Sequence, residues 1–273
     1  MTSTSTTPKL VGIVSTKGGV GKTTLALNLG WALAARGWRV LVADTDPLGG
    51  LAASVLGAAG KTGLGEVLLQ GADPQAQVVT TRSRDFDLLP LGPLATRSVD
   101  EWMARASDPT RLRAALTTAG QGHDVVLVDT PPGLYGATRG VLRAVDGVLV
   151  PLMAEPLAAR ALQPLLATLA DLREREGGGE LLGIVLTLLQ SRQASSLDVA
   201  RESWRLFPGG RVFDTSIPRD EIFLEASAAG VPVALLRQRP PAMASLFDAL
   251  AAELEPRLQL ETASHERAIP LLG

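Results

Sequence analysis

Thr16-Lys-Gly-Gly-Val-Gly-Lys-Thr-Thr24 is a glycine-rich stretch that joins an apolar run, Leu10 to Val14, to a helical pattern, Leu25 to Ala35. A turn of this kind between a strand and a helix is the context of a phosphate-binding loop. Its three glycines let backbone N–H groups surround an anion without Cβ clashes, and the helix points its positive end at the phosphates. The stretch therefore predicts a nucleotide site within an α/β fold.

Each polar side chain near the end of this loop has an expected partner. Lys22 should reach the β- and γ-phosphates, the Thr23 hydroxyl should bind Mg²⁺, and Thr24 should contact the α-phosphate. The residues expected to bind the nucleotide here are Gly18, Gly19, Val20, Gly21, Lys22, Thr23 and Thr24.

The loop departs from the ordinary G-x-x-x-x-G-K-[ST] pattern, because Thr16 stands at the first glycine position and Lys17 follows it. A lysine inside a glycine-rich loop is costly unless it meets an anion. One candidate is the phosphate chain of a nucleotide held by a second subunit. The alternative is a glycine-rich turn with two solvated lysines, but residue types, spacing and context favour the phosphate loop.

Apolar runs alternate with helical patterns along the rest of the chain. This alternation indicates βαβ units, and hence a doubly wound, mostly parallel sheet flanked by helices, the α/β architecture of P-loop NTPases. Hydrophobic residues make up 46% of the chain and aromatic residues only 4%, so the core should be aliphatic. The expected strands are 10–14, 39–43, 87–90, 124–129, 147–151, 182–187 and 212–214, and the expected helices are 25–35, 111–119, 157–176, 195–206, 223–229 and 242–258.

We expect one domain over residues 9–258, with a flexible Ser/Thr-rich tail at 1–8 and a loose tail at 259–273. The chain has no cysteine, which excludes a disulfide framework and a thiolate metal site. Its net charge of −2 argues against nucleic-acid binding by bulk electrostatics, although a local basic patch is compatible with it. The sequence has no uninterrupted run of 18 apolar residues, so it predicts no membrane-spanning helix.

Carboxylates follow two of the expected strands. Asp44 and Asp46 come directly after the second strand, and Asp129 ends the strongest apolar run. Because ligands bind at the carboxyl edge of a doubly wound sheet, all three should lie near the phosphate loop. Asp129 then becomes a candidate for holding Mg²⁺, and a hydrolase of the γ-phosphate also needs a group that positions or deprotonates water. Taken alone, the Asp44–Asp46 segment is equally compatible with an Asp-Pro turn that caps a strand. For Asp129, a capped strand end is the lesser alternative.

These motifs resemble those of the ParA/MinD family of partitioning and positioning ATPases. The loop is similar to the family's deviant Walker A motif, K-G-G-x-G-K-[ST], and Asp44-Thr-Asp-Pro-Leu-Gly49 to its D-x-D-P-Q-G switch. The resemblance implies that Lys17 reaches the partner's ATP and that Lys17, Lys22 and Asp46 are the catalytic residues. By the same match, Asp46 positions the attacking water and Asp44 supports the Mg²⁺ shell. It also makes Asp129, in Asp129-Thr-Pro-Pro132, the Walker B aspartate. Leu48 stands where the family has glutamine.

The C-terminal half resembles ParA-type sequences more than MinD-type ones, in Thr215-Ser-Ile-Pro-Arg-Asp220 and in the segment from Glu225 to Val233. The resemblance implies that Pro218 flanks the adenine pocket. Glu155 follows a strand where relatives often carry an acidic residue. It is either a dimer contact or a helix-capping carboxylate.

The resemblance further implies an ATP-dependent homodimer that binds DNA nonspecifically and is reset by a ParB-like or cargo-adaptor protein in the cytoplasm, at the nucleoid when ATP is bound. Arg192 and Arg219 match family positions on the DNA-binding face. Between Gln190 and Pro240, however, seven arginines stand against six acidic residues, a net charge of +1. Ordinary solvated arginines therefore stay an alternative.

Other members of the family offer competing functions. A MinD-like membrane ATPase needs a basic amphipathic C-terminal helix, whereas Leu246 to Leu260 holds three acidic residues and one arginine. Metal-cluster ATPases need cysteine ligands, which are absent. The phosphate loop starts so early that we expect no helix-turn-helix module before it, and hence no operator binding. A scaffold that binds ATP without hydrolysing it stays open.

Overall fold

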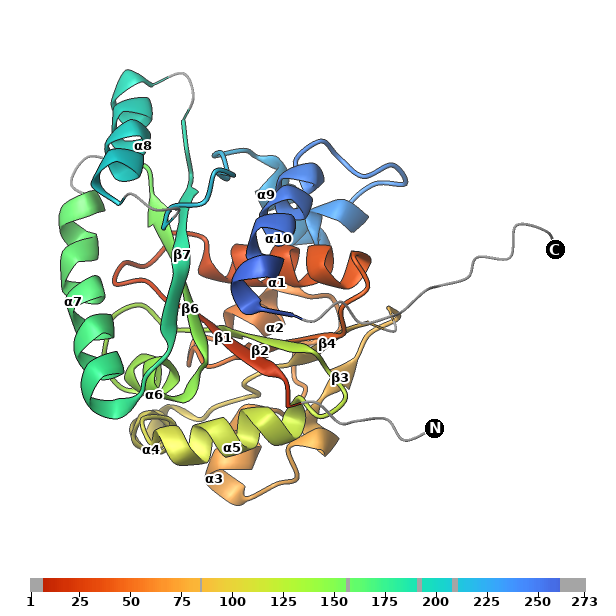
Figure 1. The fold of residues 1–273 in the computed structure, drawn as a ribbon. Coiled ribbons are helices and arrows are strands. Elements are labelled where there is room, and N and C mark those ends of the chain that lie inside the picture. Colours follow the sequence, from red (N-terminus) through yellow and green to blue (C-terminus); the bar gives the residue numbers. More distant parts are fainter. Residues whose placement is uncertain (1–6, 84, 156–157, 191–192, 208–210, 261–273) are drawn as a thin grey trace.

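A seven-stranded sheet forms the centre of the molecule in the computed structural model, which describes residues 7–83, 85–155, 158–190, 193–207 and 211–260 (Figure 1). The strand order is β3-β4-β2-β5-β1-β6-β7, and every neighbouring pair is parallel except β3 with β4. The strands are β1 (Lys9–Ile13), β2 (Val40–Asp44), β3 (Val79–Thr80), β4 (Phe86–Leu89), β5 (Val125–Asp129), β6 (Gly147–Met153) and β7 (Glu180–Thr187).

Helices cover both faces of this sheet (Figure 1). On one face lie α1 (Lys22–Ala35), α2 (Gly50–Ser54), α9 (Ile222–Ala229) and α10 (Ala244–Leu258). On the other lie α3 (Leu64–Gln70), α4 (Val99–Ala106), α5 (Pro109–Ala119), α6 (Ala137–Ala144) and α7 (Ala158–Glu176), with α8 (Ala194–Leu206) packed on α7. The predicted doubly wound α/β fold is confirmed.

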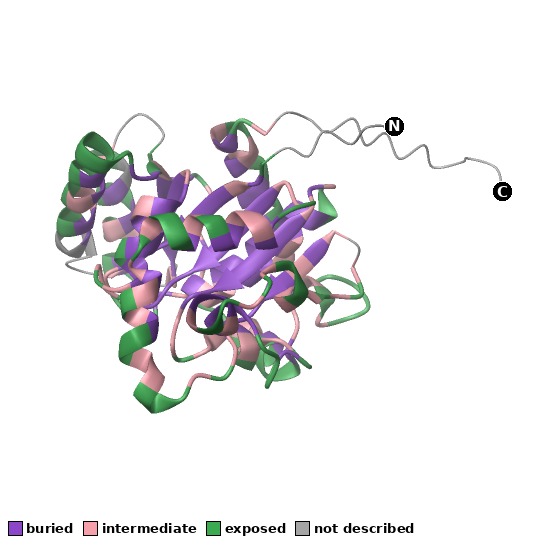
Figure 2. Cartoon of the chain, turned by 90° about the horizontal axis from the view of Figure 1, so that it is seen from below, coloured by how far each residue is buried: buried purple, intermediate pink, exposed green. Residues whose placement is uncertain are grey.

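The core consists of two aliphatic layers, one on each side of the sheet. The central strands β2 and β5 are buried along their whole length, because helices cover both of their faces. Figure 2 shows the buried strands at the centre and the exposed outer sides of the helices around them. Alternate residues of each strand feed the two layers: Val126 and Val128 enter the α3–α7 layer, and Val125 and Leu127 the α1–α10 layer.

The structure also corrects the sequence prediction in places. The expected strand at 212–214 is wrong: Val212 forms only an isolated bridge to Ile184 of β7, and the chain next forms a bridge to that edge at Pro218, opposite Leu189. The sequence prediction missed β3, α2, α3, α4 and α6, which are short elements whose periodic pattern is too brief to read. The described elements run from Lys9 to Leu258, and most of the two predicted tails lies outside the described residues.

Candidate nucleotide site

The glycine-rich loop runs from the end of β1 into α1 with an open backbone. Gly19 and Gly21 have φ of 73° and 89°, a region that residues with a side chain rarely adopt. A Cβ placed on Gly18, Gly19 or Gly21 would meet no atom within 4 Å, so the space above the loop is free for a ligand. Lys17 is exposed, and its backbone N–H donates to Ser15 Oγ at 3.3 Å.

Lys22, the first residue of α1, is buried beside carboxylates. Only 7% of it is exposed, which is unusual for a lysine. Burial lowers the pKa of its ammonium group, while the nearby negative charges of Asp129 and Asp46 act in the opposite direction. The structure thus brings together Lys22, Asp46 and Asp129, as the sequence predicted.

Asp129 ends β5 with one oxygen bound and the other free. Its Oδ2 accepts a hydrogen bond from Thr23 Oγ1 at 2.5 Å, and its buried Oδ1 has no partner among the described residues. Close packing holds Thr23 in place, since a Cβ on Gly50 would lie 3.0 Å from Thr23 Oγ1. A hydroxyl and a carboxylate with a free oxygen fit Mg²⁺, which takes one or two protein carboxylates and completes its shell with water and phosphate.

Asp44, the last residue of β2, holds the segment that follows it. Its Oδ1 accepts a hydrogen bond from Asp46 N at 2.8 Å and its Oδ2 accepts one from Leu51 N at 3.1 Å. Asp46 in turn accepts one at Oδ1 from Leu48 N at 3.0 Å. Leu48, at the family's glutamine position, is 88% exposed. The carboxylate of Asp44 therefore stabilises the backbone that carries Asp46.

Burial raises the pKa of both strand-end aspartates. The pKa of Asp44 rises to about 8, first because of desolvation and then because of the Asp129 charge. The pKa of Asp129 rises to about 6 through desolvation, although the hydrogen bond from Thr23 and the charge of Lys22 oppose the rise. Without a bound cation, this pair holds a proton that a solvated pair would release.

The raised pKa of Asp44 predicts that the nucleotide-free protein loses stability as pH rises. Its ordinary pKa is 3.8 and its folded value about 8, so its contribution is full below about pH 4 and is lost as pH rises through 8. One such group changes the unfolding free energy by up to about 1.4 kcal/mol per pH unit. Asp44→Asn carries no titrating proton and should flatten the slope of Tm against pH between 5 and 8. The same slope in variant and parent would contradict the assignment.

Hydroxyl groups tie the ends of β1, β2 and β5 together around this site. Thr45 Oγ1 donates to the carbonyl oxygen of Asp129 at 2.7 Å, and Thr130 Oγ1 donates to that of Ile13 at 2.8 Å. Gly133 N donates to Ser15 O at 3.1 Å, which fastens the Asp129-Thr-Pro-Pro segment to the phosphate loop. Sequence reasoning missed these positioning groups, because a buried threonine carries no distinctive spacing signal.

A cleft of about 540 Å³ opens beside the phosphate loop on the α1 side of the sheet. Gly19, Gly21 and Thr24 line this cleft, and so does Pro218, which was predicted to flank the base. Residues that the sequence did not single out also line it: Leu25, Thr187, Leu188, Ile217, Asp220, Glu221, Phe223, Leu224, Ser227 and Phe247. The cleft has the position and the apolar walls that a purine needs.

Of the two arginines predicted to bind DNA, the structure describes only Arg219. Arg192 lies outside the described residues. Arg219 is exposed and lines the same cleft, and its backbone N–H donates to Leu189 O at 3.0 Å. On α8, Arg201 pairs with Asp198 at 3.2 Å, which reduces the positive charge of that helix.

Glu155 lies just after β6 and is partly exposed. Its backbone N–H donates to Met153 O at 2.8 Å. Residues 156–157 after it lie outside the description, so both of its predicted roles, dimer contact or helix cap, stay open.

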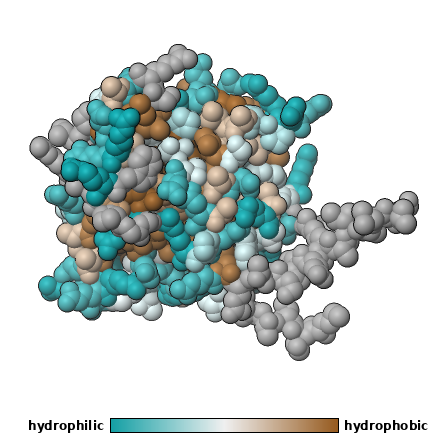
Figure 3. All heavy atoms as spheres, turned by 45° about the horizontal axis from the view of Figure 1, so that its top comes forward, coloured by the Kyte–Doolittle hydropathy of each residue, from teal (hydrophilic) through white to brown (hydrophobic). Residues whose placement is uncertain are grey.

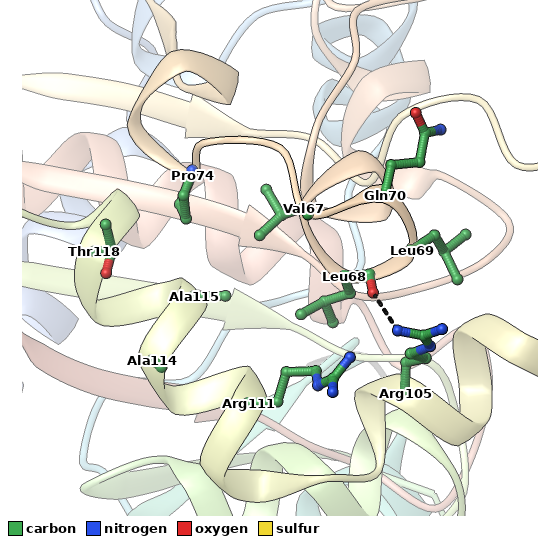
Figure 4. Close-up of a pocket in the computed structure, with 11 residues that line it drawn as sticks. Val67, Leu68, Leu69, Gln70, Pro74, Arg105, Arg111, Ala114, Ala115 and Thr118 are labelled. Atoms are coloured by element: carbon green, nitrogen blue, oxygen red, sulfur yellow. Dashed lines mark hydrogen bonds between the residues drawn. The ribbon is translucent and has the colours of Figure 1, made fainter.

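A second hollow of about 530 Å³ lies between α3 and α5 (Figure 4). Arg105 and Arg111 stand beside Leu68 there, and Arg105 is held by Glu101 at 2.9 Å and by the carbonyl oxygen of Leu68 at 3.5 Å. It shares no lining residue with the cleft beside the phosphate loop and contains none of the predicted site residues. The nucleotide site is therefore assigned to the other cleft.

Large apolar side chains are exposed in several loops and helices. Figure 3 shows hydrophobic atoms interspersed with hydrophilic ones on one face of the molecule. The exposed large hydrophobic residues are Leu48, Leu56, Tyr135, Leu224 and Leu235. Leu48 belongs to the segment after β2 and Tyr135 to the segment after β5, so each phosphate-facing loop also carries an apolar side chain into solvent.

Known proteins share both the sequence and the fold of this chain. A family model described as an AAA domain matches residues 8–178. The chromosome-partitioning ATPase Soj of Thermus thermophilus is 38% identical over 250 residues, covering 91% of this chain and 96% of Soj. This chain belongs to the ParA/MinD family of P-loop ATPases. The chromosome partitioning protein ParA of Caulobacter vibrioides is 36% identical over 232 residues, covering 83% of this chain and 86% of its own.

A solved structure supports the same assignment. Cobyrinic acid a,c-diamide synthase from Mycobacterium smegmatis, with a bound ATP analog and magnesium, has a TM-score of 0.73 and 30% identity. The match covers 90% of this chain and 93% of that one. A ParA/MinD-type ATPase with a P-loop fold, as the deviant phosphate loop predicted, is thereby established.

Proposed function

We propose that this chain is a Mg²⁺-dependent partitioning ATPase that dimerises on ATP, binds DNA nonspecifically as a dimer and is reset by partner-stimulated hydrolysis. The observation that carries the proposal is that buried Lys22 and Asp129 converge with Thr23 at the open glycine loop, where Asp129 Oδ1 has no partner among the described residues. Its relatives Soj and ParA are chromosome-partitioning proteins.

The residues divide the chemistry among them. Lys22 binds the β- and γ-phosphates, and Thr23 with Asp129 holds the metal, with Asp44 supporting the loop around it. When bound, Mg²⁺ neutralises charge on the phosphates. Asp46 orients the attacking water, because its carboxylate lies near enough to Lys22 to influence the pKa of that lysine. With the acidic groups in place, we expect slow hydrolysis by the chain alone rather than passive ATP binding.

Lys17 couples the nucleotide to dimerisation. It is an exposed lysine on an exposed part of the loop. Two copies facing each other across their phosphate loops would each present this cation to the other's triphosphate. The charge of ATP then holds together two surfaces that in its absence carry unbalanced lysines.

DNA binding should follow from the dimer, since pairing doubles a weak basic patch. We expect binding to nonspecific duplex DNA with ATP and not with ADP or without nucleotide, and affinity that falls steeply with salt. Arg219→Ala, with two copies per dimer, should lower the slope of log affinity against log salt by about two. The measurement is a salt titration by fluorescence anisotropy.

Arg175→Ala is the matched control for that titration. Arg175 is an exposed arginine near the end of α7 that pairs with Asp171 at 2.6 Å. We expect it to leave the slope unchanged. If DNA affinity is the same with and without ATP, or if the salt slope of Arg219→Ala equals that of the parent, Arg219 does not belong to the DNA-binding face.

The MinD-like alternative finds little support in α10. Phe247, Leu250 and Leu254 are buried, and the helix packs along α1, so its apolar side is already covered. Within the described residues, no helix is long and apolar enough to cross a bilayer. Pelleting with anionic liposomes and ATP distinguishes the two functions. A DNA-binding ATPase stays in the supernatant, whereas a MinD-like membrane ATPase pellets with the liposomes.

The partner and the place of action complete the proposal. We infer a cytoplasmic protein that associates with the nucleoid in its ATP state, and a ParB-like or cargo-adaptor protein that accelerates hydrolysis. The cargo is DNA or a large assembly. A phosphate-release assay with DNA and candidate partners tests this: a true partner raises the rate only when DNA and ATP are both present.

A further inference from the structure

Thr187, the last residue of β7, carries a buried hydroxyl that nothing satisfies. The residue is 3% exposed, and its Oγ1 has no hydrogen-bond partner among the described residues. Buried polar atoms in native proteins are nearly always paired, so such an exception calls for a ligand or another explanation. Thr187 also lines the cleft beside the phosphate loop.

The alternation of side chains along β7 places this hydroxyl on the nucleotide side. Ile184 and Leu186 pack in the α3–α7 layer, whereas Val185 packs in the α1–α10 layer. Thr187 therefore faces the same side as Val185. That is the side on which Thr24 of α1 and Pro218 border the cleft.

The backbone directly after Thr187 is strained. Leu188 has φ of 53°, which is uncommon for a residue with a side chain and costs free energy. The next residue is held firmly, since Leu189 N donates to Ile217 O at 3.1 Å and its carbonyl oxygen accepts from Arg219 N at 3.0 Å. This arrangement turns the end of β7 toward the Pro218 segment, and both line the cleft. Strain of this kind concentrates at ligand sites.

We propose that Thr187 reads the base of the bound nucleotide, its Oγ1 accepting a hydrogen bond from the 6-amino group of adenine. The inference rests on the proposed ATP site. Thr24 directly follows Lys22 and Thr23, which are proposed to hold the triphosphate, and it lines the same cleft as Thr187. A base in this cleft would therefore lie within reach of the end of β7.

The chemistry of the lining fits this assignment. Leu188, Pro218 and Phe223 offer apolar surface to the faces of a flat ring. The polar side chains of the cleft, apart from Arg219, present oxygen atoms; they include Thr187 and Asp220. A carboxylate only accepts hydrogen bonds, and a hydroxyl can accept as well as donate, so these side chains can all receive a ligand's donor; the amino group is the donor on adenine.

The test compares Mg·ATP with the Mg complex of purine riboside triphosphate, which lacks the 6-amino group, by titration calorimetry. The parent protein should bind ATP about five- to tenfold more tightly than the analogue. Thr187→Val keeps the shape and removes the hydroxyl, so it should bind both nucleotides equally, at the weaker level. Thr187→Ser keeps the hydroxyl and should retain the preference for ATP.

Thermal unfolding gives a second measurement, in which Thr187→Val should gain stability although it loses ATP affinity. Thr187→Val removes an unpaired buried hydroxyl and should raise the Tm of the nucleotide-free protein. Thr138→Val is the matched control, because Thr138 is equally buried but its Oγ1 donates to Pro131 O at 3.0 Å. That variant loses a hydrogen bond and should have a lower Tm. A residue with a purely structural role would not gain stability while losing ATP affinity.

The outcomes separate this inference from the function on which it rests. The role of Thr187 is overturned if Thr187→Val still prefers ATP over the analogue, or if its affinities for both ligands fall to the same extent. Neither outcome would contradict ATP binding by the parent protein. A parent protein that binds neither nucleotide overturns the proposed ATP site itself.

Discussion

Asp46→Asn is expected to bind Mg·ATP and to lose hydrolysis by a factor of about 10² to 10⁴, the range of a positioned acid or base. The asparagine side chain still offers an oxygen to Leu48 N, which Asp46 Oδ1 now accepts at 3.0 Å. The turn therefore survives, while the charge that positions water is lost. Single-turnover phosphate release measures the rate, and light scattering should show a dimer that persists with ATP.

Asp73→Asn is the matched control for this variant. Asp73 is exposed and makes the same kind of turn, accepting from Gln75 N at 3.2 Å. Its replacement should change neither turnover nor assembly. Parent-like turnover in Asp46→Asn would mean that another group positions the water, and a simultaneous loss of ATP affinity would mean that Asp46 instead supports binding.

Lys17→Ala is expected to abolish ATP-driven dimerisation while leaving ATP binding by the monomer within about threefold of the parent. The physical reason is that Lys17 is exposed, whereas Lys22 is buried beside the site's carboxylates. Only Lys22 is placed to hold the chain's own phosphates. Light scattering with ATP measures the dimer, and calorimetry measures the affinity of the monomer.

Two variants control for loss of charge in general. Lys61→Ala removes another exposed lysine and should dimerise normally. Lys17→Arg keeps the cation and should retain part of the dimer. An intact ATP dimer of Lys17→Ala would remove the cross-subunit role and reduce the loop to an ordinary nucleotide binder.

Asp44 and Thr187 both lower the stability of the nucleotide-free protein in order to form its proposed ligand site. A buried carboxyl with a pKa of about 8 and a buried hydroxyl without a partner both cost stability in the nucleotide-free protein. Both lie where a ligand would relieve the cost. Ligand binding should therefore raise the Tm of this protein, and by more at high pH than at low pH.

Local sequence was sufficient for the long elements and for the chemistry of the loop. The strand at 10–14 and the helix at 25–35 were predicted to within a few residues, because each has a clear apolar period and the glycines between them leave few alternatives. Lys22, Thr23 and Asp129 could be predicted to meet because parallel strands end at one edge of the sheet. Short elements such as α2 and α6 carried no comparable signal.

By itself, the sequence determined the family and the doubly wound fold, and it predicted which residues bind the phosphates, since these depend on residue types at fixed spacing along the chain. Only the tertiary structure decided that Asp44 holds the Asp46 segment, that one oxygen of Asp129 has no partner among the described residues, and that Thr187 and Pro218 line the same cleft. These facts depend on burial and on which groups the packed chain brings together, such as Thr23 and Asp129, which are 106 residues apart. Desolvation and hydrogen bonding are set by the packed surroundings, which no local pattern records.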